Sequence, residues 1–512
     1  MSERRIEDER QMTAFDHLLF RAEERPEARS TLLSAFVLDS VPDFARVQRA
    51  MERASRVFLR LRQHVVVPAI PIAGPEWVVD PDFDLHYHLR RAVLPAPGDM
   101  ATMLRTLEPF LMAPLDRARP LWEAILYEGF EGGRAVFALK VNHALTDGLG
   151  GVELMLEILD LERDPPEKPM PPVPVPEDLT SLELTRSAFN RLPGRLLSLV
   201  ERRAPNVARF ASQVVADPAA AVAAASDLTE SVRRLVGGPS AEPSPVLRRR
   251  SLSRRLAAFE LPLDDLRAAA RAVGGSVNDA YLAAIGGALR RYHDHLGVPV
   301  DAVPAAVPVS LRHDEHASGG NHWAGVQLPL PVGEVGVRER VALIRQHMAG
   351  ARDEPAMRVM DLMAPLMSRA PSVVLDVLSS AAAANDVQAS NIPGPSFPLY
   401  TAGAKIEQFF GFGPLPGPAM MIVLFSYDGR CFVGVNYDAV AVTDHSRFEE
   451  CLREGFDEVI AAGRPEEPAR TTARPRRAPA KKRAVRQATA ARATSRTSGR
   501  TTSERGGTGA GR

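Results

Sequence analysis

The sequence has few cysteines, no long hydrophobic run and no net charge. Two cysteines among 512 residues cannot build a disulfide framework, and such low usage is typical of a reducing compartment. No apolar stretch is long enough to cross a bilayer, and the first residues lack the apolar core of a secretion signal. We therefore expect a cytoplasmic protein that would meet any lipid substrate peripherally, at a membrane or lipid-droplet surface.

The zero net charge conceals a basic tail. Residues 470–512 contain eleven Arg, two Lys and one Glu, a net charge of +12, whereas residues 1–469 carry −12. The tail has almost no large apolar side chains, so it cannot bury a core and is predicted to be disordered. It is either a solvated extension without a task or a contact to anionic phospholipid; nonspecific nucleic-acid binding is the least favoured interpretation.

The rest of the chain has enough apolar residues for two or three domains, because 45% of all residues are hydrophobic. Proline-dense residues 165–176 predict an extended connector, and two helical segments follow, over about 179–203 and 206–236. The first segment combines apolar residues with arginines, so it either lies in a membrane interface or, as we favour, docks on the protein. We divide the chain into four parts: 1–164, a linker 165–245, a second half 246–463 and the tail 464–512.

The second half mixes helical and strand patterns. Three stretches have apolar residues at helical spacing: 263–272, 278–292 and 444–462. Two strand-like runs, 420–425 and 430–437, flank Asp428-Gly429, a pair typical of a hairpin turn. Helices and strands in this mixture indicate an α/β (mixed α+β) fold.

The most informative segment is Asn142-His-Ala-Leu-Thr-Asp-Gly148. The apolar run 134–141 before it predicts a buried strand, and helical spacing over 149–159 predicts a helix after it. The heptad is therefore predicted to be a strand-to-helix junction, with His143 at the exit of the strand. A structural interpretation remains open for each residue, because Asp147 could simply cap the helix and Gly148 could simply permit a tight turn.

Strand geometry separates the first two residues of the heptad. Successive side chains of a strand point to opposite faces, so His143 should share a face with Val141, and Asn142 with Lys140. A neutral imidazole suits general-base chemistry because its ordinary pKa lies near the working pH. The pattern therefore favours a site served by His143 alone.

The heptad resembles the His-His-x-x-x-Asp-Gly motif of the acyltransferase superfamily that includes chloramphenicol acetyltransferase and peptide-synthetase condensation domains. Further segments are similar to those of bacterial wax ester synthase/diacylglycerol acyltransferases. They follow the family's order and spread the resemblance over about residues 10–462: Met12–Asp16, Trp77, Asp82–His88, Pro114–Trp122, Asn278–Ala283, Val307–Arg312, Gly320-Asn321 and Ser390–Pro395.

The resemblance implies two chloramphenicol-acetyltransferase-like domains, each a mixed sheet with helices, and an active-site channel between them with His143 midway along it. It also implies an acyl-CoA-dependent O-acyltransferase that acts on diacylglycerol or a long-chain alcohol and makes triacylglycerol or wax ester. Acyl-CoA would be a co-substrate, and no cofactor or metal is expected. Cys431 and Cys451 lack the spacing of metal ligands.

By the same resemblance, His143 is the general base and Asp147 pairs with an arginine that braces the junction; Arg312 is our candidate. Gly148 would let the backbone approach the substrate closely. Asn278 and Ser310 could donate hydrogen bonds to the developing oxyanion, although helix capping or loop hydrogen bonding is the alternative for both.

The chain departs from the family motif at Asn142, where the family has its first histidine. An asparagine can keep a hydrogen bond but cannot exchange a proton at neutral pH. We expect an active enzyme, with reduced activity or altered specificity as possible consequences of this change. Two alternatives stay open: a related acyltransferase that uses another alcohol or a carrier-protein thioester, and a weakly active or noncatalytic lipid-binding relative.

Overall fold

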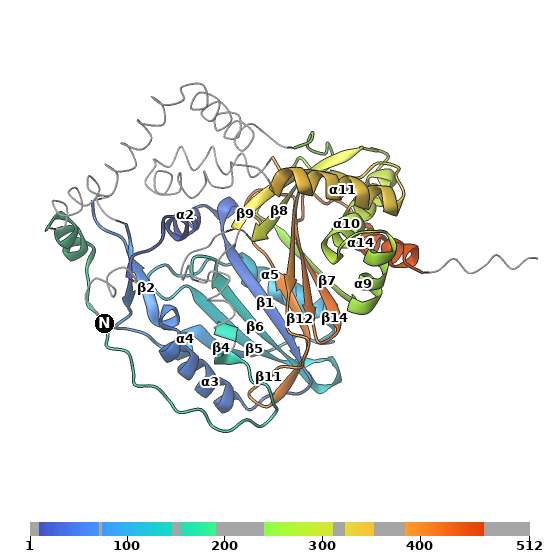
Figure 1. The fold of residues 1–512 in the computed structure, drawn as a ribbon. Helices are drawn as coiled ribbons and strands as arrows, with labels where there is room; N and C mark the ends of the chain where they lie inside the picture. Colours follow the sequence, from blue (N-terminus) through green and yellow to red (C-terminus); the bar gives the residue numbers. More distant parts are fainter. Residues whose placement is uncertain are drawn as a thin grey trace, which may run out of the picture. The chain divides into compact units, whose positions relative to one another are not determined.

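Two six-stranded mixed sheets form the centre of the fold in the computed structural model (Figure 1). The structure describes residues 10–70, 74–145, 154–155, 157–190, 240–310, 323–352 and 384–464. In spatial order the first sheet consists of β11 (Tyr400–Thr401), β12 (Ala404–Phe412), β1 (Thr31–Leu38), β6 (Arg134–Asn142), β5 (Trp122–Phe130) and β4 (Leu89–Val93). Only β4 and β5 run parallel to each other; the other neighbours in this sheet are antiparallel.

The second sheet is built from the second half of the chain. In spatial order it consists of β7 (Arg254–Pro262), β14 (Arg430–Asp438), β13 (Met420–Tyr427), β10 (Val387–Pro393), β8 (Ala302–Ser310) and β9 (Trp323–Pro331). Strand β10 runs parallel to both β13 and β8, and the remaining pairs are antiparallel. The expectation of two mixed sheets with helices is confirmed.

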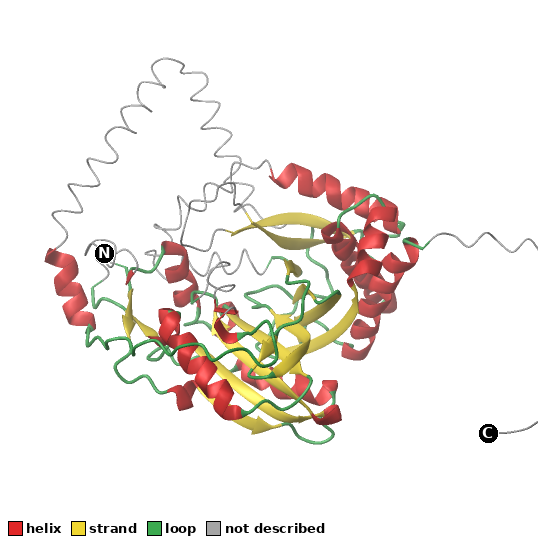
Figure 2. Ribbon diagram, turned by 60° about the horizontal axis from the view of Figure 1, so that its bottom comes forward, coloured by secondary structure: helices red, strands yellow, loops and turns green. Residues whose placement is uncertain are grey.

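Helices cover the second sheet on one side (Figures 1 and 2). They are α9 (Leu263–Ala272), α10 (Val277–His295), α11 (Val337–Arg352) and α14 (His445–Ala462). Helix α10 begins at a capping box, in which Ser276 and Asp279 each bond the other's backbone N–H. Its alanine-rich faces are buried, and Gly455 lets α14 approach it so closely that an added Cβ would lie 2.4 Å from the Ala284 carbonyl oxygen.

The first half contributes smaller helices and a two-stranded ribbon. The helices are α2 (Ala14–Ala22), α3 (Phe44–Val57), α4 (Leu85–His88) and α5 (Met100–Met112), with short 3₁₀ turns at Pro26–Ala28, Leu59–Arg62 and Glu131–Gly133. The ribbon pairs β2 (Gln63–Val66) with β3 (Glu76–Val79).

The local predictions for the second half agree with the structure. Helix α9 has the predicted bounds, α10 extends one residue before and three residues beyond its predicted span, and α14 begins directly after its cap, Asp444. The predicted hairpin joins β13 to β14, and both Asp428 and Gly429 have positive φ, at 44° and 78°. Positive φ at both central positions is the geometry of a tight hairpin turn.

The second half of the chain contributes two strands to the first sheet. Strands β11 and β12 come from the second half but lie in the first sheet, where β12 pairs with β1. Strand β12 also crosses β14 of the second sheet, and a Cβ added to Gly434 would lie 2.2 Å from the carbonyl oxygen of Gly411. A glycine is therefore required at this contact between the two sheets.

Residues 165–190 of the linker are attached to the first half, whereas Ser244, near its other end, donates to Asp386 of the second half at 2.6 Å. The proline-rich part of the linker lies along α3, where Arg49 pairs with Glu167 and Arg56 donates to the Pro171 carbonyl at 2.8 Å. Residues 181–190 are helical, and Leu184 is buried against Val66 and Val78 of the ribbon. This part of the segment docks on the protein, whereas residues 191–239 and the tail from 465 lie outside the described residues.

Candidate active site

A cavity of about 1110 Å³ is lined by strands of both sheets. Strands β1 and β12 contribute from the first sheet, β8, β10 and β13 from the second, and helix α2 supplies a further wall. Most lining side chains are apolar, among them Leu19, Leu33, Phe409, Met421, Val423 and Phe425. Small-molecule sites usually measure about 300–1,000 Å³. The cavity therefore suits a large and mainly hydrocarbon ligand.

His143 lies in the wall of this cavity. It is the first residue after β6, its side chain is partly buried, and its backbone N–H donates to the Ser30 carbonyl at 3.1 Å. Burial lowers the pKa of the imidazole because the charged form is disfavoured where water is excluded. The side chain is therefore neutral at neutral pH and can accept a proton from a bound hydroxyl group.

Asn142 lies on the other side of the strand exit. It is fully buried, and its Nδ2 donates to Glu23 Oε1 at 2.7 Å. Its Oδ1 accepts a hydrogen bond from the Ala144 N–H at 2.8 Å. As the strand alternation predicts, His143 is the residue of the pair that reaches the cavity.

The structure describes the other predicted site residues only in part. Asp147, Gly148 and Arg312 lie outside the described residues, so the proposed ion pair at the junction stays a prediction. Ser310 is the last residue of β8, opposite Trp323, and its side chain is not described.

Asn278 is the second residue of α10 and is half-buried. It is not among the described residues that line the cavity, and the N-cap of its helix is formed by its neighbours Ser276 and Asp279. Its role as an oxyanion donor stays a prediction.

The segment Ser390–Pro395, noted from its sequence, runs along the cavity. Ser390, Ile392 and the residues to Pro395 belong to the lining. A Cβ added to Gly394 would lie 2.4 Å from the Ser426 carbonyl oxygen, so this glycine lets the segment lie directly against β13. The wall of the cavity is thus fixed by a backbone contact as well as by side-chain packing.

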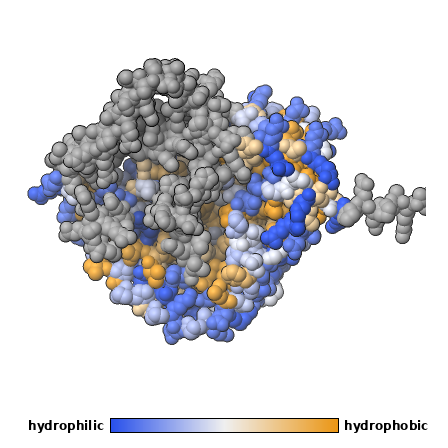
Figure 3. All heavy atoms as spheres, in the orientation of Figure 1, coloured by the Kyte–Doolittle hydropathy of each residue, from blue (hydrophilic) through white to orange (hydrophobic). Residues whose placement is uncertain are grey.

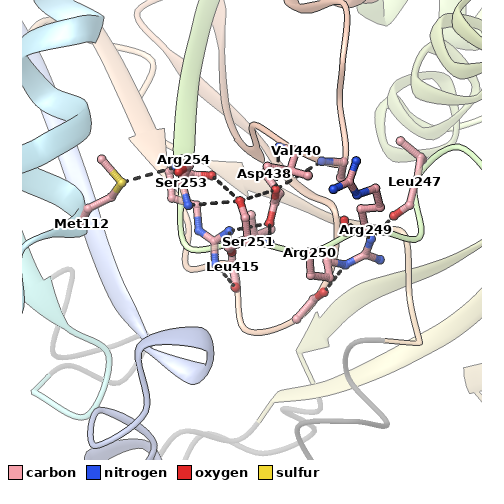
Figure 4. Close-up of polar contacts among 12 residues, drawn as sticks. Met112, Leu247, Arg249, Arg250, Ser251, Ser253, Arg254, Leu415, Asp438 and Val440 are labelled. Carbon is pink, nitrogen blue, oxygen red and sulfur yellow. Dashed lines mark hydrogen bonds and ion pairs between the residues drawn. The ribbon is translucent and has the colours of Figure 1, made fainter.

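A second wall segment, residues 413–418, is held from behind by hydrogen bonds to alternate carbonyl groups. Asn436 donates to the Gly413 carbonyl at 2.9 Å, Arg254 to that of Leu415 at 3.4 Å, and Arg250 to that of Gly417 at 2.6 Å. Figure 4 shows Arg254 pointing toward Leu415 and Asp438. No sequence pattern indicates this role, because the two arginines stand among other arginines over 248–255.

The carboxylate of Asp438 orients Arg254, the middle one of these three donors. It is fully buried and accepts hydrogen bonds from Arg254 Nη1 at 3.1 Å and from Ser251 Oγ at 2.8 Å (Figure 4). Charge-assisted hydrogen bonds of this kind are stronger than neutral ones. The network therefore fixes the loop whose Pro414 and Pro416 face the cavity.

Comparison with known proteins connects this site to one family. Residues 12–281 match the wax ester synthase/diacylglycerol acyltransferase catalytic domain, and residues 319–459 match the C-terminal domain of the same family. A Mycobacterium tuberculosis protein named as a diacylglycerol O-acyltransferase is 46% identical over 462 residues, which cover 90% of this chain and 94% of that protein. The chain belongs to the wax ester synthase/diacylglycerol acyltransferase family. The resemblance inferred from the motifs is therefore confirmed.

More distant relatives agree with this assignment and with the fold. Another M. tuberculosis protein with diacylglycerol O-acyltransferase in its name is 31% identical over 392 residues, covering 73% of this chain and 81% of its own. The wax ester synthase/diacylglycerol acyltransferase of Marinobacter aquaeolei superposes with a TM-score of 0.59 at 23% identity, over 88% of this chain and 100% of that one. The first condensation domain of the calcium-dependent antibiotic synthetase gives 0.55 at 17% identity, over 89% and 96%. This chain therefore shares its fold with these two solved structures.

Proposed function

We propose that this protein is an acyl-CoA-dependent O-acyltransferase that moves a fatty acyl group to diacylglycerol or a long-chain alcohol. The observation that carries the proposal is the position of His143 in the wall of a large apolar cavity. Membership of a family named for these two activities supports the choice of substrates.

In the proposed reaction, His143 first accepts a proton from the alcohol and then donates it to the leaving thiolate. A hydroxyl group is a weak nucleophile at neutral pH, so the imidazole takes its proton as the alcohol oxygen attacks the thioester carbonyl carbon. The tetrahedral intermediate then collapses, the carbon–sulfur bond breaks, and the imidazolium returns the proton to the departing thiolate. The products are one ester and one free CoA thiol, with no covalent acyl-enzyme and no cofactor or metal required.

The proposal is tested with the purified full-length chain and labelled palmitoyl-CoA, offered with dioleoylglycerol or with hexadecanol. We expect labelled triacylglycerol, wax ester or both, with one free CoA thiol released for each ester formed. A folded protein that forms no ester with either alcohol would overturn the proposal. Ester formed only from a carrier-protein thioester would instead support the related acyltransferase considered above.

We further propose that the enzyme takes its alcohol from a lipid surface. No helix among the described residues is long and apolar enough to span a bilayer. On the face drawn in Figure 3, the described surface mixes hydrophilic and hydrophobic residues in small patches. Among the residues that line the cavity, three large hydrophobic ones are exposed: Leu161 by 67%, Ile392 by 43% and Phe397 by 49%. We call these three residues the apolar mouth, and they are suited to contact lipid where the cavity opens.

Substitutions in the apolar mouth test this contact. Phe397→Glu and Leu161→Glu should each weaken binding to vesicles that contain dioleoylglycerol by about fivefold, because burying half of such a side chain in lipid contributes about 1 kcal/mol. Val93→Glu is the matched control, since Val93 is 70% exposed and does not belong to the described lining. Vesicle flotation measures the binding; equal losses in all three variants would contradict a specific apolar mouth.

The basic tail would add an electrostatic contact to the same surface. Its residues 470–512 lie outside the described residues, and each basic side chain near anionic lipid contributes up to about 1 kcal/mol. The lipid contact proposed here rests on the apolar mouth and does not require the tail.

A further inference from the structure

Strand β6 ends one residue before His143, so the hydrogen bonds of the sheet do not fix this residue. In the ladder between β1 and β6 the last pair is Thr31 with Asn142, so His143 lies beyond the regular hydrogen bonds of the sheet. The backbone there is fixed by the bond from the His143 N–H to the Ser30 carbonyl and by a turn in which the Leu145 N–H donates to the Asn142 carbonyl at 3.0 Å. A general base must lie within hydrogen-bond distance of the hydroxyl group. We therefore expect further contacts, besides these two backbone hydrogen bonds, to fix the position of His143.

A buried carboxylate lies directly behind this turn. Glu23, the C-cap residue of α2, is 9% exposed, and its Oε1 accepts hydrogen bonds from the Ser30 N–H at 2.7 Å and from Asn142 Nδ2 at 2.7 Å. The Ser30 hydroxyl donates to the same oxygen at 3.2 Å. With the Thr31 hydroxyl at 3.4 Å, four donors converge on one carboxylate oxygen, and Ser30 is only 3% exposed and Asn142 fully buried.

Asn142 connects this carboxylate to the backbone that follows His143. Its amide nitrogen donates to Glu23, and its amide oxygen accepts from the Ala144 N–H. The backbone of His143 is therefore fixed before and after the residue, at Asn142 and at Ala144. An amide supplies a donor and an acceptor together without binding a proton, which matches both demands of this position.

We propose that Glu23 and Asn142 are positioning residues that hold His143 in the cavity wall for the acyl transfer described above. The inference rests on that proposed function and adds a residue, Glu23, from outside the heptad. The helix that ends at Glu23 also supplies Leu18, Leu19 and Ala22 to the cavity. One hydrogen-bond network therefore holds both the backbone at His143 and the end of a helix that lines the cavity.

The test compares Glu23→Ala and Asn142→Ala with the conservative Glu23→Gln, which keeps an acceptor oxygen at the same place. Both alanine variants should lower kcat for ester formation by about 10- to 100-fold, since a small displacement of a catalytic group has effects of this size. KM for palmitoyl-CoA should stay unchanged within error, and Glu23→Gln should retain most of the parent kcat. Asn385→Ala is the matched control, because Asn385 is another buried asparagine, at 3% exposure, and does not line the described cavity.

A second readout requires no substrate. Diethyl pyrocarbonate labels accessible neutral imidazoles, and mass spectrometry reports the labelling rate of each histidine. His143 should be labelled faster in both alanine variants than in the parent, while His86, whose side chain is 80% exposed, should keep its rate. If the alanine variants do not fold, Ser30→Ala replaces them, since it deletes one hydroxyl of the network and keeps both backbone hydrogen bonds.

The outcomes separate the two proposals. Folded alanine variants with the parent's kcat and the parent's labelling rate at His143 would overturn the positioning role. An equal loss of kcat in Asn385→Ala would overturn it as well. A parent enzyme that makes no ester would count against the proposed function alone, because faster labelling of His143 in the variants would still support the positioning role.

Discussion

Replacing His143 with alanine is expected to lower kcat/KM for ester formation by about 10²- to 10⁴-fold, the usual contribution of a positioned general base. The loss follows from the geometry, because His143 is partly buried in the cavity wall and its pKa is lowered by burial, so that it is neutral and ready to accept a proton. The measurement is the steady-state rate of labelled ester formation from palmitoyl-CoA and dioleoylglycerol. Circular dichroism checks that the variant is folded.

His86→Ala is the control for this substitution. Its side chain is 80% exposed, bonds only to its neighbour Asp84 among the described contacts, and does not line the described cavity. We expect the parent rate from this variant. Full activity in His143→Ala would show that the proton is taken by another group.

Replacing Gly434 with valine is expected to destabilise the fold by about 1–3 kcal/mol or more, because extra atoms are forced into a filled contact. The obstacle is the Gly411 carbonyl oxygen, 2.2 Å from the position of a Cβ, and a backbone atom cannot rotate away as a side chain can. Valine is favoured in strands, so the loss would not come from a poor strand propensity. Urea unfolding, followed by circular dichroism, measures the change.

Gly336→Ala is the matched control for the glycine prediction. An added Cβ there has no atom within 4 Å, and the residue precedes α11. The expected cost is at most about 1 kcal/mol, since glycine is preferred to alanine at the residue before a helix but no atom has to move. Equal stability of Gly434→Val and the parent would mean that β12 and β14 can separate without cost.

Local patterns in the sequence predicted the elements that depend on local interactions. The helix 263–272 and the hairpin at Asp428-Gly429 were both predicted, because apolar spacing and turn chemistry act over a few residues. The exit of the strand at His143 was predicted for the same reason, from strand alternation. The strand exit is the feature among these on which the proposed chemistry depends.

Long-range relations could not be predicted in the same way. Nothing in residues 404–412 indicates that β12 pairs with β1, some 370 residues earlier in the chain, since strand pairing depends on the whole fold. Glu23 and Glu24 are adjacent and chemically identical. Glu23 is buried behind the turn at residues 142–145, whereas Glu24 is exposed and pairs with Arg117 at 3.0 Å. Only the arrangement of α2 against β1 distinguishes them.

The central claim is that a neutral His143 accepts the proton of the attacking alcohol, and the pH dependence of kcat/KM tests it most directly. Because burial lowers the pKa of His143, the folded enzyme should keep its base neutral into mildly acidic solution. The rate should therefore fall with decreasing pH through an apparent pKa below the ordinary histidine value, and this acid limb should be absent from the residual activity of His143→Ala. An acid limb that persists unchanged in His143→Ala would contradict the claim.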